Sequence, residues 1–149
     1  MDIKRPSVDI LLIDDDAEDR NTFSDAINEI KIRTNLTMLE DGRNLIPYLE
    51  SLKKLPEIIF LDLNMPFKSG VECLEEIRQH DWLHDLSVAI YSTSSTQKDV
   101  EDTFALGANV YIRKPTSFEK LKKVLNDVIN MNFQFYNSGL NKDTFLLNI

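Results

Sequence analysis

Short apolar runs constrain the fold of this 149-residue chain more than any other feature of its sequence. The four clearest are Val8–Ile13, interrupted only by Asp9, then Ile58–Leu61, Val88–Tyr91 and Val110–Ile112. Runs this short and this apolar are typical of strands buried on both faces, as in a parallel sheet. A fifth and weaker strand is predicted at Leu36–Glu40.

The segments between these runs have the apolar spacing of amphipathic helices. The predicted helices begin after Asp16 as an N-cap, occupy Asn44–Leu52, Val71–Arg78 and Thr96–Leu106, and follow a capping-box pattern at Thr116–Glu119. Strands that alternate with helices are joined by right-handed crossovers. The pattern therefore predicts an α/β fold, a doubly wound (βα)5 sandwich with a central five-stranded parallel sheet and flavodoxin-like topology.

The end of the chain differs in composition from the rest. We expect residues 1–131 to form the domain and residues 132–149 to form a C-terminal apolar tail. The large apolar side chains of this tail are Phe133, Phe135, Tyr136, Phe145, Leu146 and Leu147. Because an exposed apolar patch of this size is unfavourable in water, we expect the tail to pack on its own domain or on a partner.

Composition excludes several classes of function. The net charge is −8, and such a surface repels phosphate backbones, so no direct binding to nucleic acid is expected. The single cysteine, Cys73, rules out an internal disulfide and a cysteine-based zinc site. No apolar run approaches the ~20 residues that span a bilayer, and no signal-peptide core precedes the first strand. The expected location is the cytoplasm, without a membrane partner.

Polar residues stand where the predicted strands end. Asp14–Asp16 follow the first strand, Asp62 the third and Ser92 the fourth, and Lys114 follows the fifth. Ligands of open α/β sheets bind at this edge. Carboxylates brought together repel one another unless a cation lies between them, and an all-oxygen cluster suits Mg²⁺. Helix capping alone would explain only Asp16.

Lys114 precedes Pro115, which predicts a tight turn, with a cis peptide bond as one option. Such a turn would direct the Lys114 ammonium along the sheet edge towards Asp62.

Four motifs in this order resemble the response regulator receiver family of two-component signalling. They are LLIDDD, IIFLDLNMP, YSTSS and NVYIRKP, within a match that runs from about Val8 to Met131. The stretch His80–Asp85 is similar to that of single-domain receivers found with phytochrome-like histidine kinases. The loop MPFKSG departs from the commoner MPxMDG at Lys68 and Ser69, a difference that concerns partner choice.

The resemblance implies a role for each matching residue. Asp62 would be the phosphoacceptor, and Ser92 and Lys114 would contact the phosphoryl group. Tyr111 would act with Ser92 as the switch. Mg²⁺ would be bound by Asp15, Asp62 and the backbone carbonyl of Asn64, with Asp14 acting mainly through a water molecule. No organic cofactor is expected.

The function that the resemblance implies is a phosphorylation-dependent protein-interaction switch in a phosphorelay. Its phosphoryl donor would be a sensor histidine kinase, and its other partners a histidine phosphotransfer protein or a downstream target protein. A homodimer is compatible with this function. The protein would help to catalyse its own phosphorylation and dephosphorylation without being a dedicated enzyme.

Three other functions share part of this sequence pattern. A Mg²⁺-dependent phosphohydrolase of haloacid-dehalogenase type requires a second Asp two residues after the first, where this chain has Asn64, and usually a cap domain as well. A degenerate receiver would have lost key positions that this chain retains. A flavodoxin-type cofactor binder would need a phosphate-binding loop after the first strand, where Asp14–Asp16 would repel the phosphate.

Overall fold

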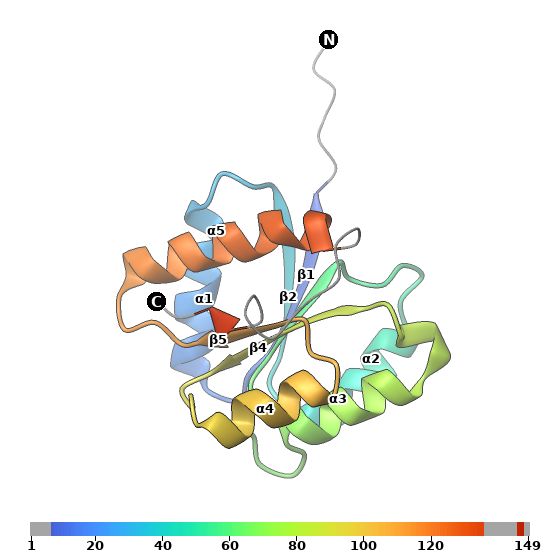
Figure 1. The fold of residues 1–149 in the computed structure, drawn as a ribbon. Helices are drawn as coiled ribbons and strands as arrows, with labels where there is room; N and C mark the ends of the chain where they lie inside the picture. Colours follow the sequence, from blue (N-terminus) through green and yellow to red (C-terminus); the bar gives the residue numbers. More distant parts are fainter. Residues whose placement is uncertain (1–6, 136–145, 148–149) are drawn as a thin grey trace.

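The computed structural model describes residues 7–135 and 146–147, and these residues form one parallel sheet covered by helices (Figure 1). The strand order is β2-β1-β3-β4-β5-β6, and every neighbouring pair is parallel. The strands are β1 (Val8–Ile13), β2 (Thr34–Leu39), β3 (Ile58–Leu61), β4 (Ser87–Ser92), β5 (Val110–Arg113) and β6 (Leu146–Leu147). The helices are α1 (Ala17–Glu29), α2 (Leu45–Glu50), α3 (Gly70–Gln79), α4 (Gln97–Ala105) and α5 (Phe118–Phe135), with short 3₁₀ helices η1 (Gly42–Asn44) and η2 (Asp81–Leu83).

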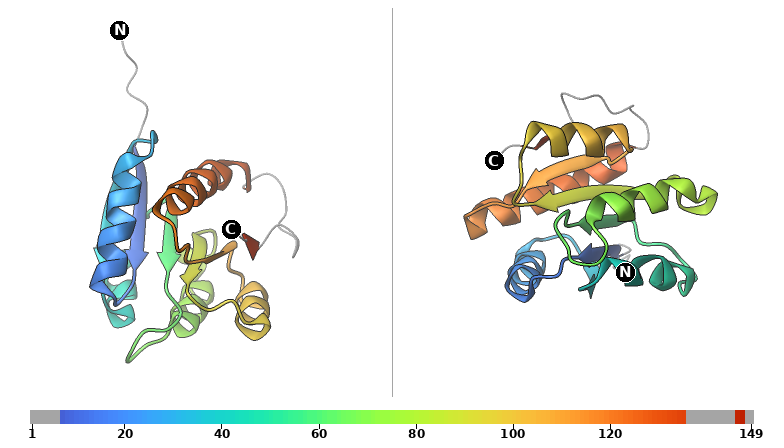
Figure 2. Two further views of the ribbon diagram at one scale, coloured as in Figure 1. Left: turned by 90° about the vertical axis from the view of Figure 1, so that its left-hand side faces the viewer. Right: turned by 90° about the horizontal axis from the view of Figure 1, so that it is seen from below.

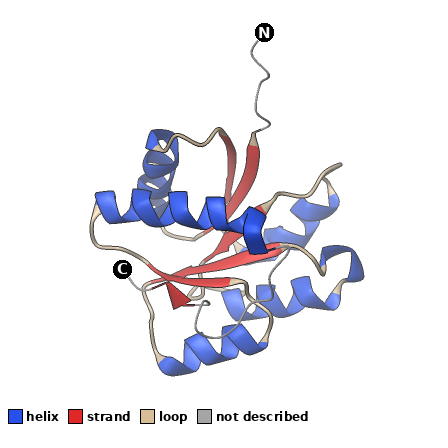
Figure 3. Ribbon diagram, turned by 45° about the horizontal axis from the view of Figure 1, so that its top comes forward, coloured by secondary structure: helices blue, strands red, loops and turns tan. Residues whose placement is uncertain are grey.

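The helices lie on both faces of the sheet, so the predicted doubly wound α/β sandwich is confirmed. Helices α1 and α5 cover one face and α2, α3 and α4 cover the other, as the views of Figures 2 and 3 show. The chain passes from β1 outward to β2 and then returns to the other side of β1 with β3. This reversal places the carboxyl ends of β1 and β3 side by side, which is where open α/β sheets bind ligands.

Two apolar cores fill the space between the sheet and its two helical layers. Side chains alternate along each strand. In β1, Leu11 and Ile13 pack towards α2 and α3, whereas Ile10 and Leu12 pack towards α1 and α5. Burial on both faces explains why β1, β3, β4 and β5 are visible in the sequence as continuous apolar runs.

Strand β2 lies at the sheet edge and differs from the prediction. It spans Thr34–Leu39 rather than Leu36–Glu40, because pairing with β1, from Val8 opposite Thr34 to Ile13 opposite Leu39, sets its bounds. Its side chains are only half-buried or exposed, so its sequence lacks a strong apolar pattern. Strands β1 and β3 have the predicted bounds, and the remaining predicted elements differ from the observed ones by one or a few residues at their ends.

Two local predictions need correction. The hydroxyl that caps α5 belongs to Ser117, which accepts from the Lys120 backbone N–H at 3.3 Å, and not to Thr116. A complete capping box lies instead at the start of α3, between Ser69 and Glu72. The described residues contain no cis peptide bond, so the bond before Pro115 is trans.

The C-terminal residues enter the fold in two places. The backbone of residues 132–135 continues α5, so the tail does not begin where the last helix ends. Strand β6 lies parallel to β5, with Leu146 opposite Tyr111 and Leu147 opposite Ile112, and adds a sixth strand to the predicted five. Tyr136 and Phe145 fall outside the described residues. Packing of the apolar tail side chains on the domain or on a partner stays a prediction.

None of the helices in the part of the chain described by the structure combines the length and apolarity needed to span a bilayer.

Candidate functional site

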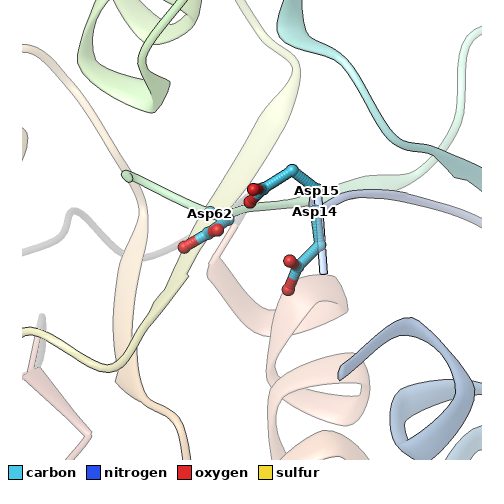
Figure 4. Close-up of side chains that lie close together, drawn as sticks. All are labelled: Asp14, Asp15 and Asp62. Atoms are coloured by element: carbon cyan, nitrogen blue, oxygen red, sulfur yellow. The ribbon is translucent and has the colours of Figure 1, made fainter. Parts of the chain in front are cut away.

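Three carboxylates meet at the carboxyl ends of β1 and β3 (Figure 4). One oxygen from each of Asp14, Asp15 and Asp62 lies within 4.8 Å of the other two. Asp14 is completely buried and Asp62 is 6% exposed, whereas Asp15 is exposed to solvent. The sequence-based expectation that these residues lie together therefore agrees with the geometry.

Backbone contacts fix the position of Asp62. Its N–H donates to the Ile13 carbonyl at 3.0 Å, which continues the pairing of β1 with β3 by one residue. The start of α3 then approaches closely, and the Gly70 N–H donates to the Leu63 carbonyl at 2.9 Å. A Cβ atom at residue 70 would overlap the Asp62 carbonyl oxygen, so only glycine allows this approach.

The charge of Asp62 is poorly stabilised in this position. Burial raises the pKa of its carboxyl to about 6, an effect opposed by the charge of Lys114 and reinforced by the charges of Asp14 and Asp15. The pKa of Asp14 is also raised, mainly by burial, although a hydrogen bond from Lys114 acts in the opposite direction. A cation placed among the three carboxylates would relieve this repulsion.

Lys114 is positioned by the end of β4. Its backbone N–H donates to the Ser92 carbonyl at 2.8 Å. Its Nζ atom lies 2.8 Å from Asp14 Oδ2 and 3.8 Å from Asp62 Oδ1. The ammonium thus reaches the site as predicted, but its shortest contacts are not with Asp62.

Asp19 is a site residue that the sequence pattern does not identify. Its Oδ2 atom lies 2.8 Å from Lys114 Nζ, as close as Asp14. Burial alone would lower the pKa of Lys114, but the hydrogen bonds to Asp14 and Asp19 and the charge of Asp62 outweigh burial and raise it. In the sequence, Asp19 is only an acidic residue in the first turn of a helix, a position that the helix dipole already favours.

The ends of β4 and β5 are joined by hydrogen bonds. Ser92 is fully buried, and its Oγ atom accepts from the Ser94 backbone N–H at 3.1 Å. The Tyr111 hydroxyl donates to the Ser94 carbonyl at 2.7 Å, and the Tyr111 ring is fully buried. Ser94, which was not predicted, therefore connects the two residues that were predicted to act as a switch.

The donor set fits a hard divalent cation. Asp14, Asp15 and Asp62 offer only oxygen ligands, which Mg²⁺ prefers, and no His or Cys belongs to the described cluster. The Asn64 backbone N–H donates to the Asp62 carboxylate and lowers its pKa. The predicted role of the Asn64 carbonyl as a ligand stays a prediction.

Comparison with known proteins gives relatives with the same fold. The chain is 30% identical over 132 residues to the response regulator Rcp1 of Synechocystis sp., a match that covers 85% of this chain and 90% of that protein. The crystal structure of the phosphorylated cyanobacterial phytochrome response regulator RcpA superposes with a TM-score of 0.78 at 26% identity, covering 86% of this chain and 95% of RcpA. The Mn²⁺-bound form of Rcp1 gives a TM-score of 0.73 at 28% identity, with 90% and 99% of the two chains covered.

The family model for the response regulator receiver domain matches residues 10–126, a span that contains β2 to β5, all but the first two residues of β1 and every residue of the site described above. Together with the geometry at the carboxyl ends of β1, β3, β4 and β5, this match shows that the chain belongs to the response regulator receiver domain family.

Proposed function

We propose that Asp62 is the phosphoacceptor of this receiver domain and that its phosphorylation by a sensor histidine kinase switches the protein between two interaction states. The observation that carries this proposal is the position of Asp62. Its carboxylate ends β3 within 4.8 Å of the Asp14 and Asp15 carboxylates and 3.8 Å from the Lys114 ammonium, to which Asp14 is already hydrogen-bonded at 2.8 Å and Asp62 is not. A nucleophile needs this combination, because the phosphoryl group brings negative charge to a site that is already acidic.

The chemical step can be written from these residues. A carboxylate oxygen of Asp62 forms a bond to phosphorus while the bond from phosphorus to the donor nitrogen breaks, and the leaving imidazole keeps the electron pair and takes a proton from solvent. Lys114 would neutralise charge on the phosphoryl oxygens, and Ser92 would donate a hydrogen bond to one of them. Asp14, Asp15 and Asp62 would bind Mg²⁺, whose chemistry is to neutralise negative charge on carboxylate and phosphoryl oxygens.

The proposed switch uses the hydrogen bonds at the end of β4. If the Ser92 hydroxyl turns to the phosphoryl group, its hydrogen bond from Ser94 is lost or rearranged. Because Ser94 also accepts from Tyr111, a movement of the β4–α4 loop changes the environment of the Tyr111 ring. The surface formed by α4, β5 and α5 would then differ between the two states.

Membership of the receiver family decides against the phosphohydrolase alternative. The residue two positions after Asp62 is Asn64, so the second Asp of that mechanism is missing. Mg²⁺ as the physiological cation, a histidine phosphotransfer protein or downstream target as a partner, a homodimer and a cytoplasmic location stay predictions.

The experiment is phosphorylation with a small phosphodonor. Incubation with acetyl phosphate and Mg²⁺ should add one phosphoryl group to the parent chain, measured by intact mass, and none to an Asp62→Asn variant. Asp16→Asn is a matched control, because it removes a carboxylate from the same acidic run while asparagine still caps α1. Labelling of the Asp62→Asn variant to the parent level would contradict the assignment.

A further inference from the structure

The Lys114 ammonium is shared unequally among three carboxylates. Asp14 and Asp19 each accept from Nζ at 2.8 Å, whereas the nearest oxygen of Asp62 lies at 3.8 Å, beyond hydrogen-bonding distance. An ammonium has three N–H donors, so two of the three are already used, one by Asp14 at the end of β1 and one by Asp19 in α1. The Lys114 side chain is 9% exposed, and its Nζ atom lies 5.2 Å from the centre of the Tyr91 ring, so little water replaces these partners.

Asp19 is held in place by the first turn of α1. Its backbone N–H donates to the capping carboxylate of Asp16 at 3.1 Å. The next residue, Arg20, donates from its guanidinium to the Asp14 carbonyl at 2.8 Å, which ties this turn to the end of β1. Asp19 therefore approaches Lys114 from a rigid position, on the side of the ammonium that faces α1.

A phosphoryl group on Asp62 requires a different position of Lys114. A charge-assisted N–H···O contact is about 2.8 Å long, so the ammonium must move from its present place towards the oxygens at Asp62. Asp14 lies beside Asp62 at the ends of neighbouring strands, and contact with it is compatible with this movement. Asp19 lies on the helix, and its hydrogen bond must lengthen or break.

We propose that Asp19 is a positioning residue that holds Lys114 on the α1 side of the site and thereby limits the rate at which Asp62 accepts a phosphoryl group. This inference rests on the proposed role of Asp62. Asp19 does not touch the reacting atoms; it acts through the position of the ammonium. Removal of its charge frees Lys114 to approach the phosphoryl group as it is transferred.

The test is a double-mutant cycle with acetyl phosphate as the phosphodonor, at saturating Mg²⁺ and with the rate of labelling followed by intact mass. Asp19→Asn should label about threefold faster than the parent, the size of effect expected from a partly exposed ion pair. In a Lys114→Met background, the same Asp19→Asn change should leave the lower rate unaltered, because the group on which Asp19 acts is gone. Asp19→Glu, which keeps the charge, should return the rate most of the way to the parent value.

Glu18→Gln is the matched control, since it removes one negative charge from the same helical turn without contact to Lys114. Its labelling rate should equal that of the parent. An equal acceleration by Asp19→Asn in both Lys114 backgrounds would show a long-range charge effect and overturn the proposal, as would an unchanged or slower rate in the parent background. If the parent chain itself took no phosphoryl group, the proposed function would fail first.

Discussion

Two half-buried cations lie at opposite ends of the same sheet, Arg78 near the amino ends of β4 and β5 and Lys114 at the carboxyl ends. The acceptors of Arg78 are neutral: the carbonyls of Leu83, His84, Leu86 and Gly107 and the side-chain oxygen of Asn109. The acceptors around Lys114 are the carboxylates of Asp14, Asp19 and Asp62. Arg78 therefore links several loops through neutral acceptors, whereas Lys114 neutralises part of the negative charge of three carboxylates.

The difference explains which end of the sheet can change state. The oxygens around Arg78 carry no net charge, and Asn109 Oδ1 accepts in addition from the Val88 backbone N–H at 2.8 Å. This network is satisfied as it stands. At the other end, the raised pKa of Asp62, caused first by burial, shows that its charge is destabilised in the folded chain. An added cation or a change in the charge of Asp62 therefore alters the energy of that end and leaves the Arg78 end unaffected.

The residues with positive φ also differ between the two ends of the sheet. At the Arg78 end, the residue with positive φ is Gly107, at 93°, where a glycine adopts the left-handed region without strain. Near the site, Phe67 has a φ of 67° and its side chain is exposed, with the Arg43 guanidinium 4.1 Å from the ring centre. Among the described residues, Phe67 is the one non-glycine residue with a positive φ. The backbone strain therefore lies beside the acidic site and not in the loops around Arg78.

The largest effect is expected for Arg78→Met. Loss of the guanidinium leaves several loop carbonyls without their donor, and the free energy of unfolding should fall by about 3 kcal/mol, measured by urea denaturation. The exposed Lys98→Met change is the control and should leave the urea midpoint unaltered. At a temperature where both variants are folded, labelling of Asp62 should be normal. An unchanged urea midpoint for Arg78→Met would contradict the structural role of Arg78.

The next effect has the opposite sign. Asp62→Asn should raise the free energy of unfolding by about 2 kcal/mol near pH 7.5 in the absence of Mg²⁺, because it removes a charge whose folded-state pKa is about 6 against an ordinary 3.8. Since the folded chain binds this proton more tightly than the unfolded chain, the cost of ionisation is fully present above the folded pKa and disappears as the pH falls through it. The advantage of the variant should therefore vanish below about pH 4. A stability gain of equal size at both pH values would contradict the electrostatic cause.

Removal of the cation should have a smaller effect. With Mg²⁺ at ten times its dissociation constant, the parent should be about 1.4 kcal/mol more stable than in the presence of a chelator. Asp15→Asn should reduce this difference, whereas Asp81→Asn, a change at the opposite end of the sheet, should not. Thermal melts with and without Mg²⁺ measure both. The same stabilisation in all three proteins would place the cation outside the three-carboxylate cluster.

The smallest effects test the backbone. Gly107→Ala should lose about 1 kcal/mol, because alanine is strained at positive φ and its Cβ would lie 3.2 Å from Arg78 Nε. Phe67→Asn should gain about 0.5 kcal/mol, because asparagine adopts this region more readily than phenylalanine, less the lost contact with Arg43. Urea midpoints of the two variants should therefore move in opposite directions. A loss of stability in Phe67→Asn would show that the ring contributes more by packing than its φ costs.

The sequence by itself determined the parts of the protein in which a local pattern of residues is compatible with only one tertiary environment. Continuous apolar runs identified β1, β3, β4 and β5, because strands buried on both faces need apolar residues at every position. The polar residues at or directly after the ends of these strands then located Asp14, Asp62, Ser92 and Lys114 at one edge, since the carboxyl ends of parallel strands lie at the same edge of the sheet. Burial and chain direction are sufficient for both conclusions.

Only the tertiary structure determined the contacts of residues whose presence is already explained by their local position in the sequence. Asp19 satisfies a helix dipole, Arg78 resembles any basic residue in the last turn of a helix, and Thr116 is as good a cap as Ser117. Strand β2 is set by hydrogen bonds to β1 rather than by its own side chains, and β6 by pairing with β5. Hydrogen bonds and ion pairs between distant segments depend on distances in space that no local period of the sequence encodes. For this reason the sequence located the acidic site, whereas the partner that holds its lysine away from Asp62 became visible only in the folded chain.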